Sequence, residues 1–263
     1  MKCPKASLTF STNGILTDSI VSKMEEIRRV NPRVSVSVSI DDFQPSDAIL
    51  RGSLTHFQNA WATAKELKDR NFNVGIGSVV TDLNFVELPA FHSLCSSRGF
   101  YYGIALPMSS VHYYNSDGHS MLHAPSKDVA GLIKQIRGDS TFSRLQAKAL
   151  TSPNLVPCFS CFSSFFLSSV GNVYPCIMRN DQLGNLTQRP LEEIWRSAAT
   201  KNMRRSIVKG ECSCFNYCEV KSSLDANIFP SIMARTESYK VILITFNSTR
   251  LNRYWCSEGR KVW

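Results

Sequence analysis

The stretch CFSCFSSFFLSSVGNVYPC, residues 158–176, decides how the second half of this chain folds. It holds three cysteines, and a further three follow at Cys212, Cys214 and Cys218. Gly171 separates two β-rich runs, 165–169 and 172–174, which predicts a β-hairpin. Thiolates gathered from separate segments are the ligands of iron–sulfur clusters and structural zinc sites. The sequence therefore predicts a soft-metal site with the candidate ligands Cys158, Cys161, Cys176, Cys212, Cys214 and Cys218.

The cysteines could instead form disulfides in a secreted domain, and three observations favour metal binding over that alternative. The chain has nine cysteines, an odd number, and Met1–Pro4 is followed by no apolar secretory segment. A chain of 263 residues can also bury a core without cross-links. No apolar stretch approaches the roughly 20 residues that a membrane span needs. We therefore expect a cytoplasmic protein that has no contact with membranes.

The net charge of +9 comes from 30 basic and 21 acidic residues. A basic surface can attract nucleic acid or another anionic partner. Here the basic residues form no long block, and pairs such as Arg28-Arg29 and Arg204-Arg205 stand alone on expected helices. We expect scattered solvated charges and no nucleic-acid partner.

The first 106 residues alternate between strand and helix patterns. The expected strands are 7–12, 34–40, 73–80 and 100–106, and the expected helices are 18–30, 55–70 and 85–95. This order is typical of βαβ units on a parallel sheet. Right-handed crossovers bring the carboxyl ends of such strands to one edge, where α/β proteins bind their ligands. Further helices are expected over 127–137 and 191–208.

A series of short motifs runs along the chain. They are Thr12-Asn13-Gly14, Ser39-Ile40-Asp41, Ile49-Leu50-Arg51-Gly52, Val79–Asn84, Gly171-Asn172-Val173-Tyr174-Pro175-Cys176, Leu183-Gly184-Asn185-Leu186, Pro190–Trp195 and Cys212-x-Cys214-x3-Cys218. In kind and in order, these motifs resemble those of radical S-adenosylmethionine (SAM) enzymes with a SPASM or twitch domain. Each motif alone is weak, whereas their order makes the resemblance specific over residues 7–221.

The resemblance implies an α/β fold, a partial (β/α) barrel from its third strand onward, followed by a small cysteine-rich α+β SPASM/twitch domain. The expected boundaries are 1–126 for the partial barrel, 127–152 for a helical linker, 153–221 for the iron–sulfur domain and 222–263 for an unassigned tail.

The resemblance also implies two cofactors. An auxiliary 4Fe–4S cluster would be held by the cysteines named above, and either Cys158 or Cys161 fits the spacing to Gly171. S-adenosylmethionine would be bound through its ribose and carboxylate by Ser39 and Arg51, with Asn13 and Asn84 as further candidates. A hydroxyl at a strand end reaches a ribose, and an arginine pairs with a carboxylate through two hydrogen bonds.

The implied function is that of an oxidoreductase or maturase that abstracts hydrogen from a peptide or a small molecule. An electron donor such as flavodoxin or ferredoxin would serve it. The Cys-x3-Cys-x2-Cys motif of the SAM-cleaving cluster is absent from the sequence, so we expect an N-terminal truncation and no SAM cleavage by this chain. The alternative is a non-enzymatic zinc- or iron–sulfur-binding module with a basic partner-binding surface.

Overall fold

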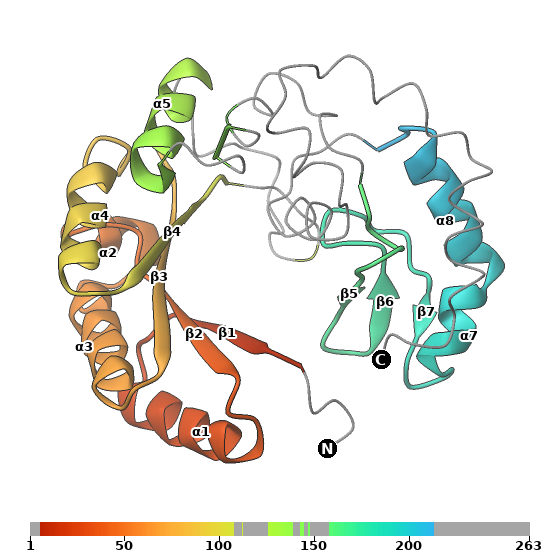
Figure 1. Cartoon of the computed structure of the whole chain (residues 1–263), viewed down its shortest axis with the longest axis horizontal. Helices are drawn as coiled ribbons and strands as arrows, with labels where there is room; N and C mark the ends of the chain where they lie inside the picture. Colours follow the sequence, from red (N-terminus) through yellow and green to blue (C-terminus); the bar gives the residue numbers. More distant parts are fainter. Residues whose placement is uncertain are drawn as a thin grey trace. The chain divides into compact units, whose positions relative to one another are not determined.

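The computed structural model describes residues 6–107, 112, 126–138, 143–144, 147 and 158–212. The chain forms two compact units, Met1–Met108 with Gly118–Ala147, and Ser109–Asp117 with Lys148–Trp263 (Figure 1). The predicted ligands Cys214 and Cys218 and the unassigned tail 222–263 lie outside the described residues.

The first unit is built on a parallel sheet of four strands in the order β1-β2-β3-β4. The strands are β1 (Leu8–Thr12), β2 (Val34–Ser39), β3 (Asn73–Val79) and β4 (Tyr101–Ala105). Their order along the chain equals their order in the sheet, as in a segment of a (β/α) barrel. The predicted α/β fold with a parallel sheet is therefore confirmed.

Helices alternate with these strands and bury one face of the sheet. They are α1 (Thr17–Val30), α2 (Ser46–Arg51), α3 (His56–Asp69), α4 (Leu88–Ser97) and α5 (Ser126–Arg137). Figure 1 shows α1, α3 and α4 on the same side of the sheet. Val36, Val38 and Ile76 pack there against Leu67 and Phe91. The helix predicted as a linker, α5, contacts α4 and β4.

Strand side chains alternate between the two faces of a sheet. On the face opposite the helices, β2 and β3 carry mainly serine and glycine. Along β2 the valines are buried, whereas Ser35, Ser37 and Ser39 are half-buried. The register pairs Ser39 with Gly77, and Gly77 with Gly103, so three small residues lie in one row across the strands. This row crosses the sheet near the carboxyl ends of β2 and β3.

The second unit contains the three-stranded antiparallel sheet β5-β6-β7. Its strands are β5 (Phe166–Leu167), β6 (Asn172–Tyr174) and β7 (Gly184–Asn185), and β5 with β6 confirms the predicted hairpin. Its core joins Cys161, Val173, Leu183, Ile194 and Met203.

The prediction of one helix over 191–208 was wrong. The structure has two helices, α7 (Leu191–Arg196) and α8 (Ala198–Val208), separated at Ser197. Ser197 has an extended backbone, with φ −64° and ψ 161°, and its hydroxyl accepts the Thr200 N–H at 3.2 Å. A serine in this position caps a new helix start in place of continuing the old one.

Gly14 gives a test of the packing between α3 and β2. Its φ is +74°, and an added Cβ would lie 2.8 Å from both Ala60 Cα and Val38 Cγ1. Gly14→Ala should therefore lower the free energy of unfolding by about 2 to 5 kcal/mol, as left-handed strain adds to overpacking. Gly52→Ala is the control, because Gly52 has φ +70° and no atom within 4 Å of an added Cβ. Equal losses in the two variants, measured by chemical denaturation, would contradict this packing.

Candidate functional site

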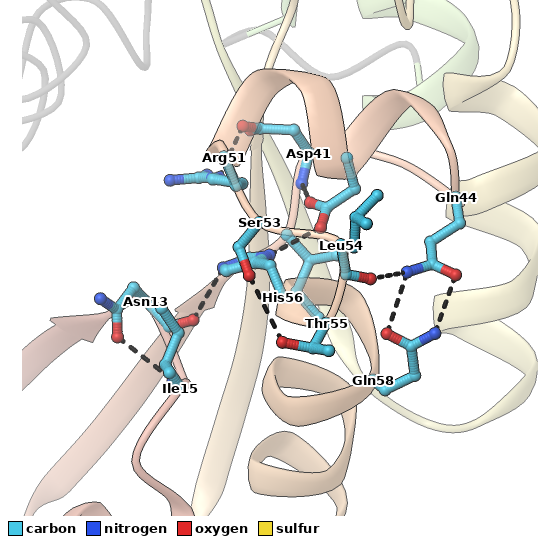
Figure 2. Close-up of polar contacts among 12 residues, drawn as sticks. Asn13, Ile15, Asp41, Gln44, Arg51, Ser53, Leu54, Thr55, His56 and Gln58 are labelled. Carbon is cyan, nitrogen blue, oxygen red and sulfur yellow. Dashed lines mark hydrogen bonds and ion pairs between the residues drawn. The ribbon is translucent and has the colours of Figure 1, made fainter.

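Asp41, just after β2, connects three elements at the edge formed by the carboxyl ends of the strands in the first unit. We call this edge the ligand edge, because α/β proteins bind their ligands there. Asp41 Oδ2 pairs with Arg51 Nε of α2 at 2.7 Å, and its Oδ1 accepts the Val79 N–H of β3 at 2.8 Å. Its own N–H donates to Asp47 Oδ1 at 2.9 Å (Figure 2). Burial raises the pKa of Asp41 above its ordinary value, against the lowering influence of Arg51 and the Val79 N–H. The carboxylate thus holds α2 against the ends of β2 and β3.

His56 and Asp47 extend this network to the turn after β1. His56 Nδ1 lies 2.6 Å from Asp47 Oδ2, and Nε2 lies 2.9 Å from the Asn13 carbonyl oxygen (Figure 2). Both side chains are at most 1% exposed. The Asn13 carbonyl only accepts, so Nε2 is the donor of that hydrogen bond. The pair therefore fixes the β1 turn to α2.

Sequence reasoning missed both members of this pair. The available signal was the periodicity of α3, in which His56, Ala60, Thr63, Ala64 and Leu67 are the buried positions. A histidine on the buried stripe of a helix needs a polar partner, but nothing in the sequence says which one. The structure identifies Asp47 as this partner, because the short helix α2 places it against His56 of α3.

The four predicted cofactor-binding residues lie at this edge: Ser39 ends β2, Arg51 ends α2, and Asn13 and Asn84 follow β1 and β3. They differ in how many of their polar atoms are already used by the protein. Arg51 uses Nε for Asp41, and no described residue pairs with its two terminal nitrogens. Ser39 lies on the small-residue face of β2. Asn13 is exposed, and its Oδ1 accepts the Ile15 N–H at 3.2 Å.

Asn84 is fully buried and uses its whole amide. Its Oδ1 accepts from the N–H and the hydroxyl of Thr81, and its Nδ2 donates to the carbonyls of Asp41 and Val79 at 2.9 and 2.8 Å. No donor or acceptor of the side chain is left for a ligand. Asn84 can therefore serve a cofactor only through the loop that it fixes.

Asp42, next to Asp41, is buried with no good hydrogen bond to either carboxylate oxygen, and it is 1% exposed. Burial, with added repulsion from Glu87 and Asp47, raises the pKa of Asp42 from 3.8 to about 6. The nearby N–H of Phe43 and hydroxyl of Ser46 lower it by less. A charged carboxylate in this position costs free energy at neutral pH.

In the second unit, the loop that begins at Cys158 is tied to the hairpin that presents Cys176. The Ser160 hydroxyl donates to the Pro175 carbonyl, next to Cys176. Cys161 and Cys176 are 0% and 3% exposed, whereas Cys158 is half-buried. Cys161 belongs to the apolar core with its left-handed backbone at φ +64°.

The predicted ligand Cys212 follows α8 and lies near Arg179. Arg179 pairs with Asp181 at 2.7 Å, and Asp181, with a smaller influence of Cys212, raises the pKa of Arg179. Within the described ranges, no three Cys, His, Asp or Glu side chains gather closely enough to hold a metal ion. The described thiols still fit an iron–sulfur cluster in donor type, and two of the six candidates fall outside those ranges.

Comparison with known proteins identifies the second unit. Residues 158–219 match the family model of SPASM, described as an iron–sulfur cluster-binding domain. A SPASM domain binds iron–sulfur clusters, which confirms the expected kind of auxiliary cofactor. No curated protein sequence matches the chain.

Solved structures share the fold at low sequence identity. The chain is 16% identical to native anSMEcpe with bound AdoMet, with a TM-score of 0.53. The match covers 74% of this chain and 58% of that one. Streptococcus suis SuiB is 16% identical, with a TM-score of 0.58 and coverages of 78% and 52%. SuiB bound to the precursor peptide SuiA gives a TM-score of 0.56 at 16% identity, with coverages of 78% and 51%. The chain thus spans little more than half the length of these proteins.

The resemblance to radical SAM enzymes with a SPASM domain is therefore confirmed, by the family match for the cysteine-rich domain and by the shared fold for the sheet. Among the described helices, none has the length and apolar character needed to cross a membrane.

The pKa of Asp42 yields a test by pH. Its charged form is disfavoured in the folded state, so the penalty is absent below pH 3.8 and complete above about pH 6. Asp42→Asn should raise the free energy of unfolding at pH 7.5 by at most roughly 3 kcal/mol, because a pKa shift of about two units corresponds to that free energy. The gain should vanish near pH 4, where the carboxyl group is largely neutral in both the folded and the unfolded state. Thermal denaturation across this range measures it, with exposed Asp69→Asn as control. A gain that is the same at pH 4 and pH 7.5 would exclude this explanation.

Proposed function

We propose that the chain carries the auxiliary-cluster domain and part of the SAM- and substrate-binding barrel of a radical SAM/SPASM maturase that abstracts hydrogen from a peptide. The SPASM match over residues 158–219, on a chain whose other unit is a parallel sheet with a polar ligand edge, is the observation that carries the proposal. In the family that the chain resembles, the cluster of the Cys-x3-Cys-x2-Cys motif would pass one electron to SAM, and SAM would then release methionine and the deoxyadenosyl radical that takes the hydrogen atom. That motif is absent from the present sequence, so the proposal assigns to this chain the binding of SAM and not its cleavage.

For SAM, Arg51 is the best-placed residue. Its Nε is held by Asp41, which orients the guanidinium and leaves both terminal nitrogens for a carboxylate. Ser39, on the small-residue face at the end of β2, would accept or donate to the ribose. Asn13 and Asn84 support the same edge, Asn13 through the carbonyl bonded to His56 and Asn84 through the carbonyl of Asp41.

A peptide is the favoured substrate class. The solved neighbours include anSMEcpe with the Cp18Cys peptide and SuiB with its precursor peptide SuiA. The row of Ser39, Gly77 and Gly103 offers an extended ligand a face with almost no side-chain volume. A flavodoxin or ferredoxin as electron donor and a cytoplasmic location complete the proposal.

For the auxiliary cluster, we assign Cys158, Cys176, Cys214 and Cys218 as ligands, with Cys212 as a further candidate. Cys158 is favoured over Cys161 because the Cys161 side chain packs in the apolar core, whereas Cys158 is half-buried at the start of the loop.

Anaerobic reconstitution tests the cluster. Purified protein should bind about four iron per chain if one 4Fe–4S cluster forms. The triple variant Cys176→Ala, Cys214→Ala and Cys218→Ala should bind none, Cys158→Ala should lose most iron, and Cys161→Ala should retain it. Cys95→Ala is the control, because burial raises the pKa of the Cys95 thiol to about 12 within the first unit. A colourless protein loaded with zinc would favour the non-enzymatic module instead.

Equilibrium dialysis with SAM tests the first unit. Arg51→Lys keeps a charge beside Asp41 but loses the two terminal nitrogens that can bind a carboxylate together. Gly103→Leu fills the row of small residues, where an added Cβ meets no described atom within 4 Å. Each should weaken SAM binding by about tenfold, or 1.4 kcal/mol. Gly131→Leu, at another glycine with no atom within 4 Å of an added Cβ, should have no effect. Unchanged binding in Arg51→Lys would remove Arg51 from the site.

A further inference from the structure

The loop from Cys158 to Ser164 contains a strained residue that is held on both sides. Cys161 has φ +64°, a left-handed conformation that is unfavourable for a non-glycine residue. Its N–H donates to the Ser164 carbonyl at 2.9 Å, and its carbonyl accepts from Arg204 Nε at 2.7 Å. Arg204 therefore supplies, from α8, one of the two hydrogen bonds that hold this backbone.

Two aromatic rings fix the guanidinium of Arg204. Its central carbon lies 4.7 Å from the ring centre of Trp195 and 5.7 Å from that of Phe162. Phe165 contacts Trp195 edge-on at 5.9 Å. No carboxylate among the described residues pairs with Arg204. Its guanidinium contacts the Cys161 carbonyl and these rings, and it also interacts electrostatically with the Cys161 side chain. A planar guanidinium suits such a site, because it can stack and donate at once.

This contact connects two segments that each lead to a candidate ligand. The loop on one side begins at Cys158, and Ser160 ties it to Pro175 beside Cys176. On the other side α8 ends at Val208, four residues before Cys212. Arg204 thus holds the loop that begins at Cys158 from the helix that leads to Cys212.

We infer that Arg204 is a positioning residue for the auxiliary iron–sulfur cluster, setting the loop of Cys158 relative to the helix that leads to Cys212. The inference rests on the proposed function of these cysteines as cluster ligands. Outer residues of this kind that orient metal ligands typically change metal affinity 10- to 100-fold when replaced.

Three variants test the inference. Arg204→Met removes the charge and the donor, and Arg204→Lys keeps the charge but cannot both stack and donate from the Nε position. Arg205→Met is the matched control, because Arg205 is the exposed neighbour and hydrogen-bonds Asn202 of the same helix. In reconstituted protein, transfer of iron to a chelator should be about tenfold faster for both Arg204 variants than for wild type or Arg205→Met. The electron paramagnetic resonance spectrum of the dithionite-reduced cluster should change only in the Arg204 variants.

A second measurement does not need the cluster. In metal-free protein, iodoacetamide should label Cys161 faster in the Arg204 variants than in wild type, by mass spectrometry, while Cys95 stays protected. Wild-type rates of iron transfer and an unchanged spectrum in both Arg204 variants would overturn the inference. Wild-type protein that binds no iron would instead contradict the proposed function, and the labelling of Cys161 would still decide whether Arg204 holds the loop. If Arg204→Met does not fold, Arg204→Lys carries both measurements.

Discussion

The ion pair between Asp41 and Arg51 is the constraint on which the ligand edge depends. A carboxylate removed from water is tolerated only where hydrogen bonds and a countercharge replace its hydration. The Asp41 carboxylate meets this condition through Arg51 and the Val79 N–H, and its backbone is held by Asp47 and Asn84. These partners come from α2, from β3 and from the loop after β3, so Asp41 connects all three to the end of β2.

In the cysteine-rich unit, a positively charged group is partly removed from water. There the guanidinium of Arg204 is half-buried, and a carbonyl and two rings replace part of its hydration. In both units a long-range polar contact fixes a loop that the hydrophobic core alone would leave free to adopt several positions. Hydrophobic packing is non-directional and determines which elements contact one another, whereas the directional polar contacts determine the position of each loop.

Much of the fold could be predicted because period-two and helical patterns are local. The run VSVSVSI at 34–40 defines β2 without reference to anything else. Helix α2 was missed because six residues carry too little periodicity, and the break at Ser197 was missed because apolar spacing continues across it. His56 with Asp47, and the choice between Cys158 and Cys161, depend on tertiary contacts and one backbone dihedral. No spacing in the sequence encodes these.

The alternation along β2 and β3 has a consequence for how such a protein can change over time. The buried positions are valine in β2 and Val74, Ile76 and Ser78 in β3, while the positions between them, mostly serine and glycine, shape the opposite face. Mutations at the second set alter the volume and polarity of that face without touching the core. Descendants of this chain can therefore change that face step by step while inheriting the same scaffold.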